Sequence, residues 1–567
     1  MLDKDYITVL KEHFHFNQFR DKQLEIIKSV IIDKKDICAI MFTGAGKSLC
    51  YQFPPVYTNK VSIVVSPLIA LMDDQKIKLD KLGVPSICLN GTVRAKDKIK
   101  SDILANKYRI VYTTPEYIVT QKDFLIELLD NDIIMMIAID ESHCVSTWGH
   151  DFRDSYRQLY GLKTWLPNIP ILAMTATATI KVQDDIIKTL KLNDPIIVKT
   201  TFDRPNLYIE IKLKTNPIND LVKLLNDKDP AIIYCQTRKD TEQISNILEK
   251  KGIICAAYHA GMTCVERESV HMDFVSNLID CIVATVAFGM GIDKVIRKVI
   301  HYGIPKDIES YYQEIGRAGR DGLHSICYMF YSPSDFSNGG YFINKITNQA
   351  YMLHRTKLLD IMKKYIYING CRRQYILTYF DEEYDKDNCN MCDNCVRNVV
   401  INKVDFTQEA VLLLYVIYET GSYYGIKMMI DVLRGSGSKK IPYDFKKLCV
   451  YGMGTTHSDI WWKIFSRMLI NINYLKEKPI SGGHSFSICR TITARKWLEQ
   501  VVEKDGITLK NSCKDGANRL ILTLPKEMEQ FYKPVVVKPK NTNIIINTDV
   551  NKIKATNTIL YKSLMQF

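Results

Sequence analysis

The chain has 567 residues and a mass of 65.4 kDa, which exceeds what one hydrophobic core usually holds and predicts about three to four domains. It has no apolar run of the ~18 residues that cross a bilayer, and its start, MLDKDYITVLKEHFHF, is not a signal peptide, so we expect neither a membrane protein nor a secreted one. The formal net charge of +13 suits an anionic partner, although many basic soluble proteins have none.

Short apolar runs rich in Ile and Val recur through the first 205 residues. They cover residues 37–42, 61–66, 108–114, 133–140 and 169–177. Runs of this length, separated by helix-length segments, are typical of a parallel sheet buried on both faces. We therefore predict an α/β domain over residues 1–205.

A second series of apolar runs begins after the segment RPNLYIEIKLK. Its members are residues 231–235, 254–260, 281–286, 298–303 and 325–331. The same reasoning predicts a second α/β domain over 206–340. A helical, cysteine-bearing segment follows over 341–403.

The pattern changes to amphipathic helices over residues 404–527. A hairpin pattern with two adjacent glycines, EKPISGGHSFSICRTIT, follows these helices and predicts a winged helix. The last 37 residues carry six lysines and one aspartate, so residues 528–567 are expected to form a basic, disordered tail.

A glycine-rich segment, MFTGAGKS, follows the first predicted strand. Gly44 and Gly46 let backbone N–H groups approach a phosphate, Lys47 supplies a point charge, and Ser48 can bind Mg²⁺. Met41 stands where the strict pattern has glycine, and a turn of this quality alone is often only a turn. The segment is therefore a candidate phosphate loop.

Two acids, Asp140 and Glu141, end the apolar strand IAID about 90 residues later. An Asp-Glu pair alone is more often part of a solvated loop, but the end of a buried parallel strand is the ligand edge of such a sheet. There Asp140 can hold Mg²⁺ through water, and Glu141 can orient or deprotonate an attacking water.

Aromatic and basic residues crowd the loop STWGHDFRDSY that follows. Trp148 and Phe152 can stack on unpaired bases, and Arg153 can contact phosphate. His150 can link this loop to the hydrolytic site. The alternative is that the aromatic rings only pack beneath the loop.

An ordered set of segments resembles the RecQ family of superfamily 2 DNA helicases across residues 14 to about 525. The segments are FHFNQFRDKQ, SPLIALMDDQ, TTPE, DESH, STWGHDFR, TATAT, FDRPNL, AYHAGM, ATVAFGMGID and YYQEIGRAGRDG. The resemblance implies two tandem RecA-like parallel-sheet domains, then a helical zinc-binding subdomain and a winged-helix domain.

The resemblance also assigns residues to the nucleotide site. Arg20 and Gln23 stand where the family reads adenine, and the Gln23 amide has the donor and acceptor that adenine requires. Thr43 and Gln313 are placed in the same site. The second domain supplies Arg317 and Arg320, both of which lie in GRAGR, as arginine fingers that stabilise transition-state charge. Without that motif they would be taken as a surface pair.

Four of the sixteen cysteines cluster and match the family's zinc site: Cys371, Cys389, Cys392 and Cys395. Four thiolates without an open position specify a structural tetrahedral site. Disulfides are the alternative, and an intracellular chain disfavours them.

The segment VLRGSGSKKI resembles the family's winged-helix module, in which basic and hydroxyl groups contact phosphates of duplex DNA without reading sequence. The candidates are Arg434, Ser436, Ser438, Lys439 and Lys440. A helix-turn-helix that binds protein is the alternative.

Some positions depart from the family. Phe42 and Ala45 replace a proline and a glycine, the chain after Asp293 is one residue shorter, and the wing tip SGGH has no tyrosine, which leaves His484 or Phe486 to replace it.

The resemblance implies an ATP- and Mg²⁺-dependent 3′–5′ helicase that acts on single-stranded and duplex DNA in recombination, repair or replication. We expect no membrane contact and a location at DNA in a nucleus, or in a nucleoid or viral replication site. The sequence is compatible with a monomer but does not determine the oligomeric state. Two alternatives are an RNA helicase of the same superfamily and a DNA-binding scaffold with an inactive ATPase. The zinc and winged-helix segments disfavour the first, and intact Lys47, Asp140, Glu141, Arg317 and Arg320 disfavour the second.

Overall fold

A computed structural model gives the fold of most of the chain. It describes residues 2–149, 151–285, 294–386, 388–396, 403–421, 423–479, 486–503, 507–524, 528 and 531. His150, the segment 286–293, the wing tip with His484, the side chain of Phe486 and nearly all of the predicted tail lie outside the described residues. Within the described ranges, no helix combines the length and the apolar character needed to cross a membrane.

The first domain is a seven-stranded parallel sheet in the order β3-β4-β2-β5-β6-β1-β7. Its strands are β1 (Ile37–Ile40), β2 (Val61–Val65), β3 (Ser86–Cys88), β4 (Ile110–Thr113), β5 (Ile134–Ile139), β6 (Ile171–Thr175) and β7 (Ile196–Lys199). Its helices are α1 (Leu2–Phe14), α2 (Gln23–Ile31), α3 (Lys47–Thr58), α4 (Ile69–Lys81), α5 (Lys96–Leu104), α6 (Pro115–Ile118), α7 (Lys122–Asp130), η1 (Ser142–Val145), α8 (Asp154–Arg157), α9 (Tyr160–Trp165) and α10 (Ile180–Thr189).

The second domain is a six-stranded parallel sheet in the order β10-β11-β9-β12-β13-β8. Its strands are β8 (Leu207–Leu213), β9 (Ala231–Cys235), β10 (Cys255–Tyr258), β11 (Cys281–Ala284), β12 (Lys298–Tyr302) and β13 (Ser325–Tyr331). Its helices are α11 (Pro217–Leu225), α12 (Arg238–Lys250), α13 (Cys264–Val275) and α14 (Ile308–Ile315). Three strands in the two sheets, β3, β7 and β8, are additional to the apolar runs of the sequence.

Alternate residues of the central strands serve two cores, as a sheet buried on both faces requires. In β1, Cys38 and Ile40 join one apolar cluster, whereas Ile37 and Ala39 join the cluster on the other face. The first of these clusters continues into the second sheet and into the helices that follow it. The two sheets and those helices therefore share an apolar core.

The helices that follow the second sheet carry the cysteine cluster. They are α15 (Pro333–Asn344), α16 (Gln349–Tyr367), α17 (Arg372–Tyr379) and α18 (Asp393–Val396). The loop before α18 lies along the edge strand β8: the Ile209 N–H donates to the Met391 carbonyl at 3.0 Å, and Ile209 forms a parallel bridge with Cys392. The cysteine-bearing loop thus covers an edge of the second sheet.

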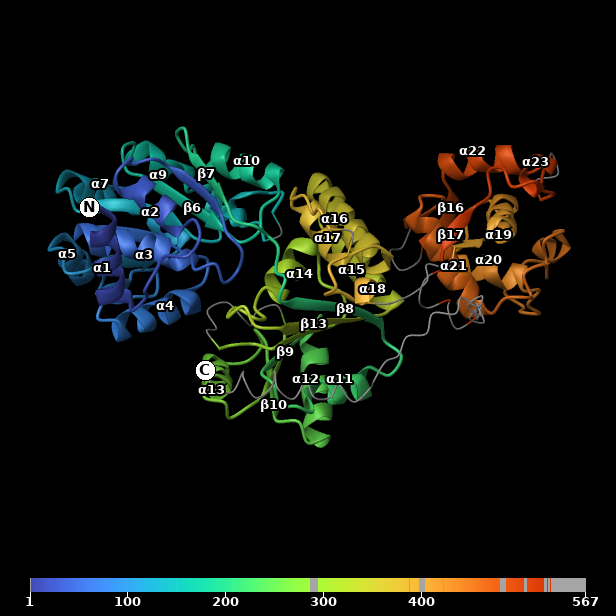
Figure 1. Cartoon of the computed structure of the whole chain (residues 1–567), viewed down its shortest axis with the longest axis horizontal. Coiled ribbons are helices and arrows are strands. Elements are labelled where there is room, and N and C mark those ends of the chain that lie inside the picture. The colour runs from blue at the N-terminus through green and yellow to red at the C-terminus, as the bar shows by residue number, and fades with distance from the viewer. Residues whose placement is uncertain are drawn as a thin grey trace, which may run out of the picture.

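The C-terminal domain has a separate core built around Trp461, Trp462 and Phe465. Its elements are β14 (Lys403–Asp405), α19 (Thr407–Glu419), α20 (Ile426–Leu433), η2 (Tyr443–Lys447), α21 (Asp459–Asn471), β15 (Leu475–Pro479), β16 (Phe486–Arg490), α22 (Ile492–Val501), α23 (Asn511–Lys514) and β17 (Ile521–Thr523). The antiparallel pair β15–β16 forms the predicted wing. Figure 1 shows this domain beyond the yellow helices α15–α18, on the side away from the first domain.

Candidate functional site

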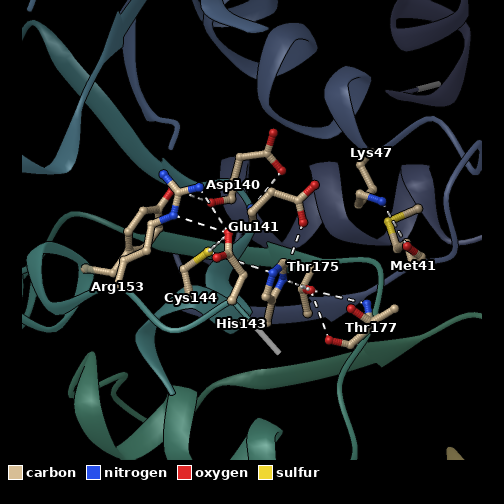
Figure 2. A network of polar contacts seen from close by, with 11 residues as sticks. Met41, Lys47, Asp140, Glu141, His143, Cys144, Arg153, Thr175 and Thr177 are labelled. Atoms are coloured by element: carbon tan, nitrogen blue, oxygen red, sulfur yellow. Dashed lines mark hydrogen bonds and ion pairs between the residues drawn. The ribbon is translucent and has the colours of Figure 1, made fainter. Parts of the chain in front are cut away.

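The glycine-rich segment links β1 to α3 as a phosphate loop would. Gly44 and Gly46 have backbone φ values of 97° and 83°, which residues other than glycine rarely adopt. Lys47 begins α3 and its Nζ donates to the Met41 carbonyl at 3.1 Å (Figure 2). Burial lowers the pKa of Lys47, and the charges of Glu141 and Asp140 oppose this shift. The loop therefore places a cation beside the two acids.

Arg20 and Gln23 lie against this loop. Gln23 begins α2 and its Nε2 donates to the Gly46 carbonyl at 2.9 Å, while its Oε1 accepts from the Arg20 N–H at 2.7 Å. The Arg20 guanidinium donates to the Gly44 carbonyl at 2.5 Å. The two side chains predicted to read adenine thus border the phosphate loop, and adenine recognition itself stays a prediction.

The acidic pair follows β5, facing the phosphate loop (Figure 2). Burial, together with the charge of Glu141, raises the pKa of Asp140 to about 7. Glu141 takes a left-handed backbone conformation with φ 50°, which turns the chain into η1. Carboxylate and hydroxyl oxygens are the ligands that Mg²⁺ prefers, so Asp140 with Ser48 in the first turn of α3 fits this ion.

His143 connects the acidic pair to the end of β6. Its Nδ1 lies 3.3 Å from Glu141 Oε2 and 2.8 Å from Thr175 Oγ1. Thr175 Oγ1 also accepts from the Thr177 N–H at 3.2 Å (Figure 2). No role was predicted for His143 from the sequence, because a histidine beside two acids is not by itself a recognisable site. His143 therefore lies between Glu141 and the end of β6.

The arginine-bearing segment of the second domain reaches the phosphate loop. A Cβ built on Gly44 would lie 3.3 Å from Arg320 Cγ, so the Arg320 side chain packs on the loop. Arg317 is 7% exposed. Burial raises the pKa of Tyr234 to about 12, and the nearby charge of Arg317 opposes this rise. Gln313 lies half-buried on α14. Both domains therefore border the same site, as the GRAGR motif of the second domain predicted.

The aromatic loop is held by contacts of two kinds. Arg153 donates to the Pro67 carbonyl at 2.9 Å and to Asp151 at 3.0 Å, while Phe152 is half-buried. Trp148 packs between Lys181, whose Nζ lies 3.1 Å from the ring centroid, and the His354 ring at 5.2 Å. Stacking of these aromatics on bases stays a prediction; the structure shows Trp148 in contact with α10 and α16.

The four clustered cysteines meet in space, with their Sγ atoms all within 4.8 Å of one another. Hydrogen bonds from Cys371 and Cys389 lower the pKa of Cys392, so the group favours a thiolate. Four convergent sulfurs with at least one thiolate fit Zn²⁺, which binds thiolate sulfur at about 2.3 Å. The chain would hold zinc here as a structural ion joining α17 to α18.

The basic turn after α20 displays its cations to solvent. Arg434, Lys439 and Lys440 are exposed. The hydroxyls of Ser436 and Ser438 accept backbone N–H groups of Ser438 and Lys440, each at 3.3 Å, so these side chains shape the turn. An ordered basic turn can contact phosphates, and this contact stays a prediction.

Four family models match consecutive parts of the chain. A DEAD/DEAH box helicase model covers residues 20–186, and a helicase conserved C-terminal domain model covers 216–322. A RecQ zinc-binding model covers 333–396, and an RQC domain model covers 400–512.

Curated proteins match over most of this chain. ATP-dependent DNA helicase RecQ of Haemophilus influenzae is 37% identical over 481 residues, which are 83% of this chain and 76% of that protein. A protein of Acanthamoeba polyphaga mimivirus, whose name calls it an ATP-dependent RNA helicase, is 45% identical over 84% of this chain and 88% of its own length. The mouse bifunctional 3′-5′ exonuclease/ATP-dependent helicase WRN is 42% identical over 87% of this chain, which spans 37% of WRN.

A solved structure agrees on the fold. The crystal structure of the helicase MrfA bound to DNA matches 66% of this chain and 57% of its own with a TM-score of 0.50 and 19% identity, which concerns the fold alone. The zinc-binding and RQC models distinguish this chain from helicases with the two parallel-sheet domains only. Together with the identity to the bacterial protein, they establish that the chain belongs to the RecQ family of ATP-dependent DNA helicases.

Proposed function

We propose that this protein hydrolyses ATP between its two parallel-sheet domains and uses the cycle to move 3′ to 5′ along single-stranded DNA, unwinding duplexes, forks or junctions. The observation that carries the proposal is the packing of Arg320 on Gly44. It brings a cation of the second domain to the phosphate loop of the first. A nucleotide at this loop would contact both domains, so its hydrolysis can change how they sit together.

The residues divide the chemistry between them. Lys47, which begins α3 beside the acids, is suited to the β- and γ-phosphates, and the N-terminus of α3 favours anions. Glu141 is suited to orient the attacking water, and His143 Nδ1 lies 3.3 Å from its carboxylate. Arg317 and Arg320 are suited to the charge that develops on the transferred phosphoryl group. When bound, Mg²⁺ would neutralise phosphate charge beside Asp140.

Two parts of the chain are suited to DNA. The aromatic loop begins a few residues after Glu141, so contact with a strand there can reach the group that controls water. The exposed basic turn after α20 offers cations to duplex phosphates. The net charge of +13 favours a polyanion at both places.

An RNA helicase is the second candidate, because the mimivirus relative is named as one. The zinc-binding and RQC models at residues 333–396 and 400–512 favour DNA. ATP turnover measured with single-stranded DNA and with RNA of equal length decides between them. Stronger stimulation by RNA would overturn the proposal.

Unwinding of tailed duplexes tests the whole proposal. Duplexes with a 3′ tail should be unwound in the presence of ATP, and duplexes with a 5′ tail or without ATP should not. Unwinding from the 5′ tail would overturn the polarity. Absence of ATP turnover with any nucleic acid would favour a DNA-binding scaffold instead.

The setting of this activity is also part of the proposal. We infer that the chain acts as a monomer at DNA inside the cell, in a nucleus or in a nucleoid or viral replication site. Recombination, repair and replication are the processes that use such an activity. Sedimentation of the purified chain with and without tailed DNA tests the monomer.

A further inference from the structure

Arg204 lies in the linker between β7 and β8, outside the residues that the sequence analysis assigned to the site. Arg204 is 7% exposed. One guanidinium nitrogen, Nη1, donates to the Thr43 carbonyl of the phosphate loop at 3.2 Å and to the Gly316 carbonyl at 3.3 Å. The other, Nη2, donates to the carbonyls of Ala318 and Gly319 at 2.8 and 2.9 Å.

The two groups of acceptors belong to different domains. Thr43 is part of the first domain, and residues 316–319 follow α14 in the second, where they include Arg317 and precede Arg320. A Cβ built on Gly316 would lie 3.2 Å from Thr43 Cβ, so the two segments are in close contact at this point. The planar guanidinium spans that contact.

The charge of Arg204 is unusual for a buried arginine. Across the described residues its guanidinium pairs with no carboxylate, and its hydrogen bonds go to carbonyl oxygens. The ring of Phe42 lies 5.5 Å from the Arg204 Cζ and offers it an aromatic face. A buried cation that is not neutralised costs free energy, and a role in the site would explain why the chain keeps this arginine.

The linker that carries Arg204 is itself held by the zinc-binding helices. Arg373 donates to Asp203 at 2.7 Å, and Glu382 accepts from the Phe202 N–H at 2.6 Å. Phe202 also stacks on Phe380 with ring centroids 4.4 Å apart. The guanidinium is therefore placed by a rigid support and not by a free loop.

We propose that Arg204 is a positioning residue for phosphoryl transfer: it holds the segment that carries Arg317 and Arg320 in register with Thr43 of the phosphate loop. Its bonds to Ala318 and Gly319 stay within the linker and the second domain, whereas its bond to Thr43 joins the domains. Separation of the domains must break the bond to Thr43. Arg204 thus sets where the arginine fingers stand when the domains meet.

The inference rests on the proposed ATP hydrolysis, and a KM-against-kcat comparison tests it. Arg204→Gln should lower kcat for DNA-stimulated hydrolysis about ten-fold or more, because small misplacement of catalytic groups has large effects on rate. KM for ATP should change by less than about three-fold, because Lys47 and the phosphate loop remain. Arg204→Lys should recover part of the loss, because an ammonium keeps up to three donors for the same carbonyls.

Asn206→Ala is the matched control. Nδ2 of Asn206 donates to the same Gly319 carbonyl and to Leu323, each at 2.9 Å, but it makes no bond to the phosphate loop. Its kcat should stay within about three-fold of wild type. Thermal unfolding and zinc content should match wild type in each variant that is compared.

Three outcomes would overturn the inference. They are a wild-type kcat in folded Arg204→Gln, a loss confined to KM, and an equal loss of kcat in Asn206→Ala. If Arg204→Gln does not fold, Phe42→Leu is the alternative test, because it removes the aromatic ring that faces the Arg204 guanidinium. This variant should lower kcat without changing KM. An unchanged kcat would contradict the inference. Absence of ATP turnover in the wild-type chain would instead contradict the proposed function.

Discussion

Arg372 and Asp393 form a buried bidentate ion pair beneath the cysteine cluster. The Arg372 Nε and Nη2 donate to the two carboxylate oxygens of Asp393 at 2.5 and 3.1 Å, and the side chains are 5% and 3% exposed. The same carboxylate accepts the Ile211 N–H of β8 at 3.2 Å. Arg372 and Asp393 each follow a zinc-site cysteine in the sequence, and their ion pair therefore connects that site to the second sheet.

Loss of one partner of this pair should destabilise the protein strongly. Asp393→Asn leaves the Arg372 charge buried, which typically costs about 3–5 kcal/mol. Denaturant unfolding followed by circular dichroism, with zinc content measured alongside, checks this. The control is Lys22→Ala, which removes an exposed pair with Glu25 and should leave the unfolding midpoint unchanged. Equal midpoints for Asp393→Asn and wild type would contradict the buried pair's role.

Lys47→Ala and Glu141→Gln should abolish DNA-stimulated ATP hydrolysis and unwinding. Both residues address phosphate or water and lie away from the basic turn, so DNA binding should be largely retained. Steady-state ATPase and fluorescence anisotropy with labelled single-stranded DNA measure the two properties. Substantial turnover by either variant would mean that the site is placed wrongly.

Metal analysis of the purified protein should find about one zinc per chain. Cys392→Ser should lower soluble yield and the thermal unfolding temperature, because binding of a structural zinc contributes directly to folding. Cys264→Ser changes an exposed cysteine outside the cluster and should leave both properties as in wild type. Active protein without zinc would remove the metal from this account.

The aromatic loop should couple DNA to hydrolysis. Phe152→Ala and Arg153→Ala should strongly reduce stimulation of ATPase by single-stranded DNA, with unchanged ATP affinity and a modest loss of DNA affinity. The reason is that Arg153 anchors the loop to the Pro67 carbonyl. Arg157→Ala, an exposed arginine on α8, is the control. Wild-type stimulation in both loop variants would show that these side chains only pack.

Neutralising Arg434, Lys439 and Lys440 together should weaken duplex binding. The slope of log affinity against log salt should fall by roughly one unit per lost phosphate contact. ATPase driven by single-stranded DNA should change much less. The control variant replaces Lys34, Lys98 and Lys122 by alanine. These lysines are exposed on the first domain, so the control removes the same charge from a different surface. An unchanged salt slope in the winged-module variant would assign that turn to a protein partner.

The sequence predicted the architecture well wherever strands are buried on both faces. β1, β2 and β9 are buried along their whole length and almost entirely apolar, so they were visible as runs. β8 was missed because it is an edge strand whose residues alternate between buried and half-exposed, and its charged positions hide it among loops. β3 has three residues and β7 is also an edge strand, so neither forms a continuous apolar run.

Site residues were predictable where function depends on side-chain type at fixed spacing. Lys47 and the four cysteines are of this kind. Arg204 could not be predicted as a site residue. Its acceptors are carbonyls as far as 161 residues away, and a backbone carbonyl is the same in every residue. The packing of Trp148 on His354 joins positions about 200 residues apart and follows from the placement of α16, which no local pattern contains.

The contact between the cysteine-bearing loop and β8 has a further consequence. β8 is an outermost strand, and strands with open backbone groups recruit other chains and promote aggregation. The loop occupies the Ile209 N–H, and Asp393 occupies the Ile211 N–H. The cysteine-bearing loop and Asp393 therefore cover part of this outermost strand. Removal of zinc should loosen that cover, so self-association through β8 should accompany the loss of stability.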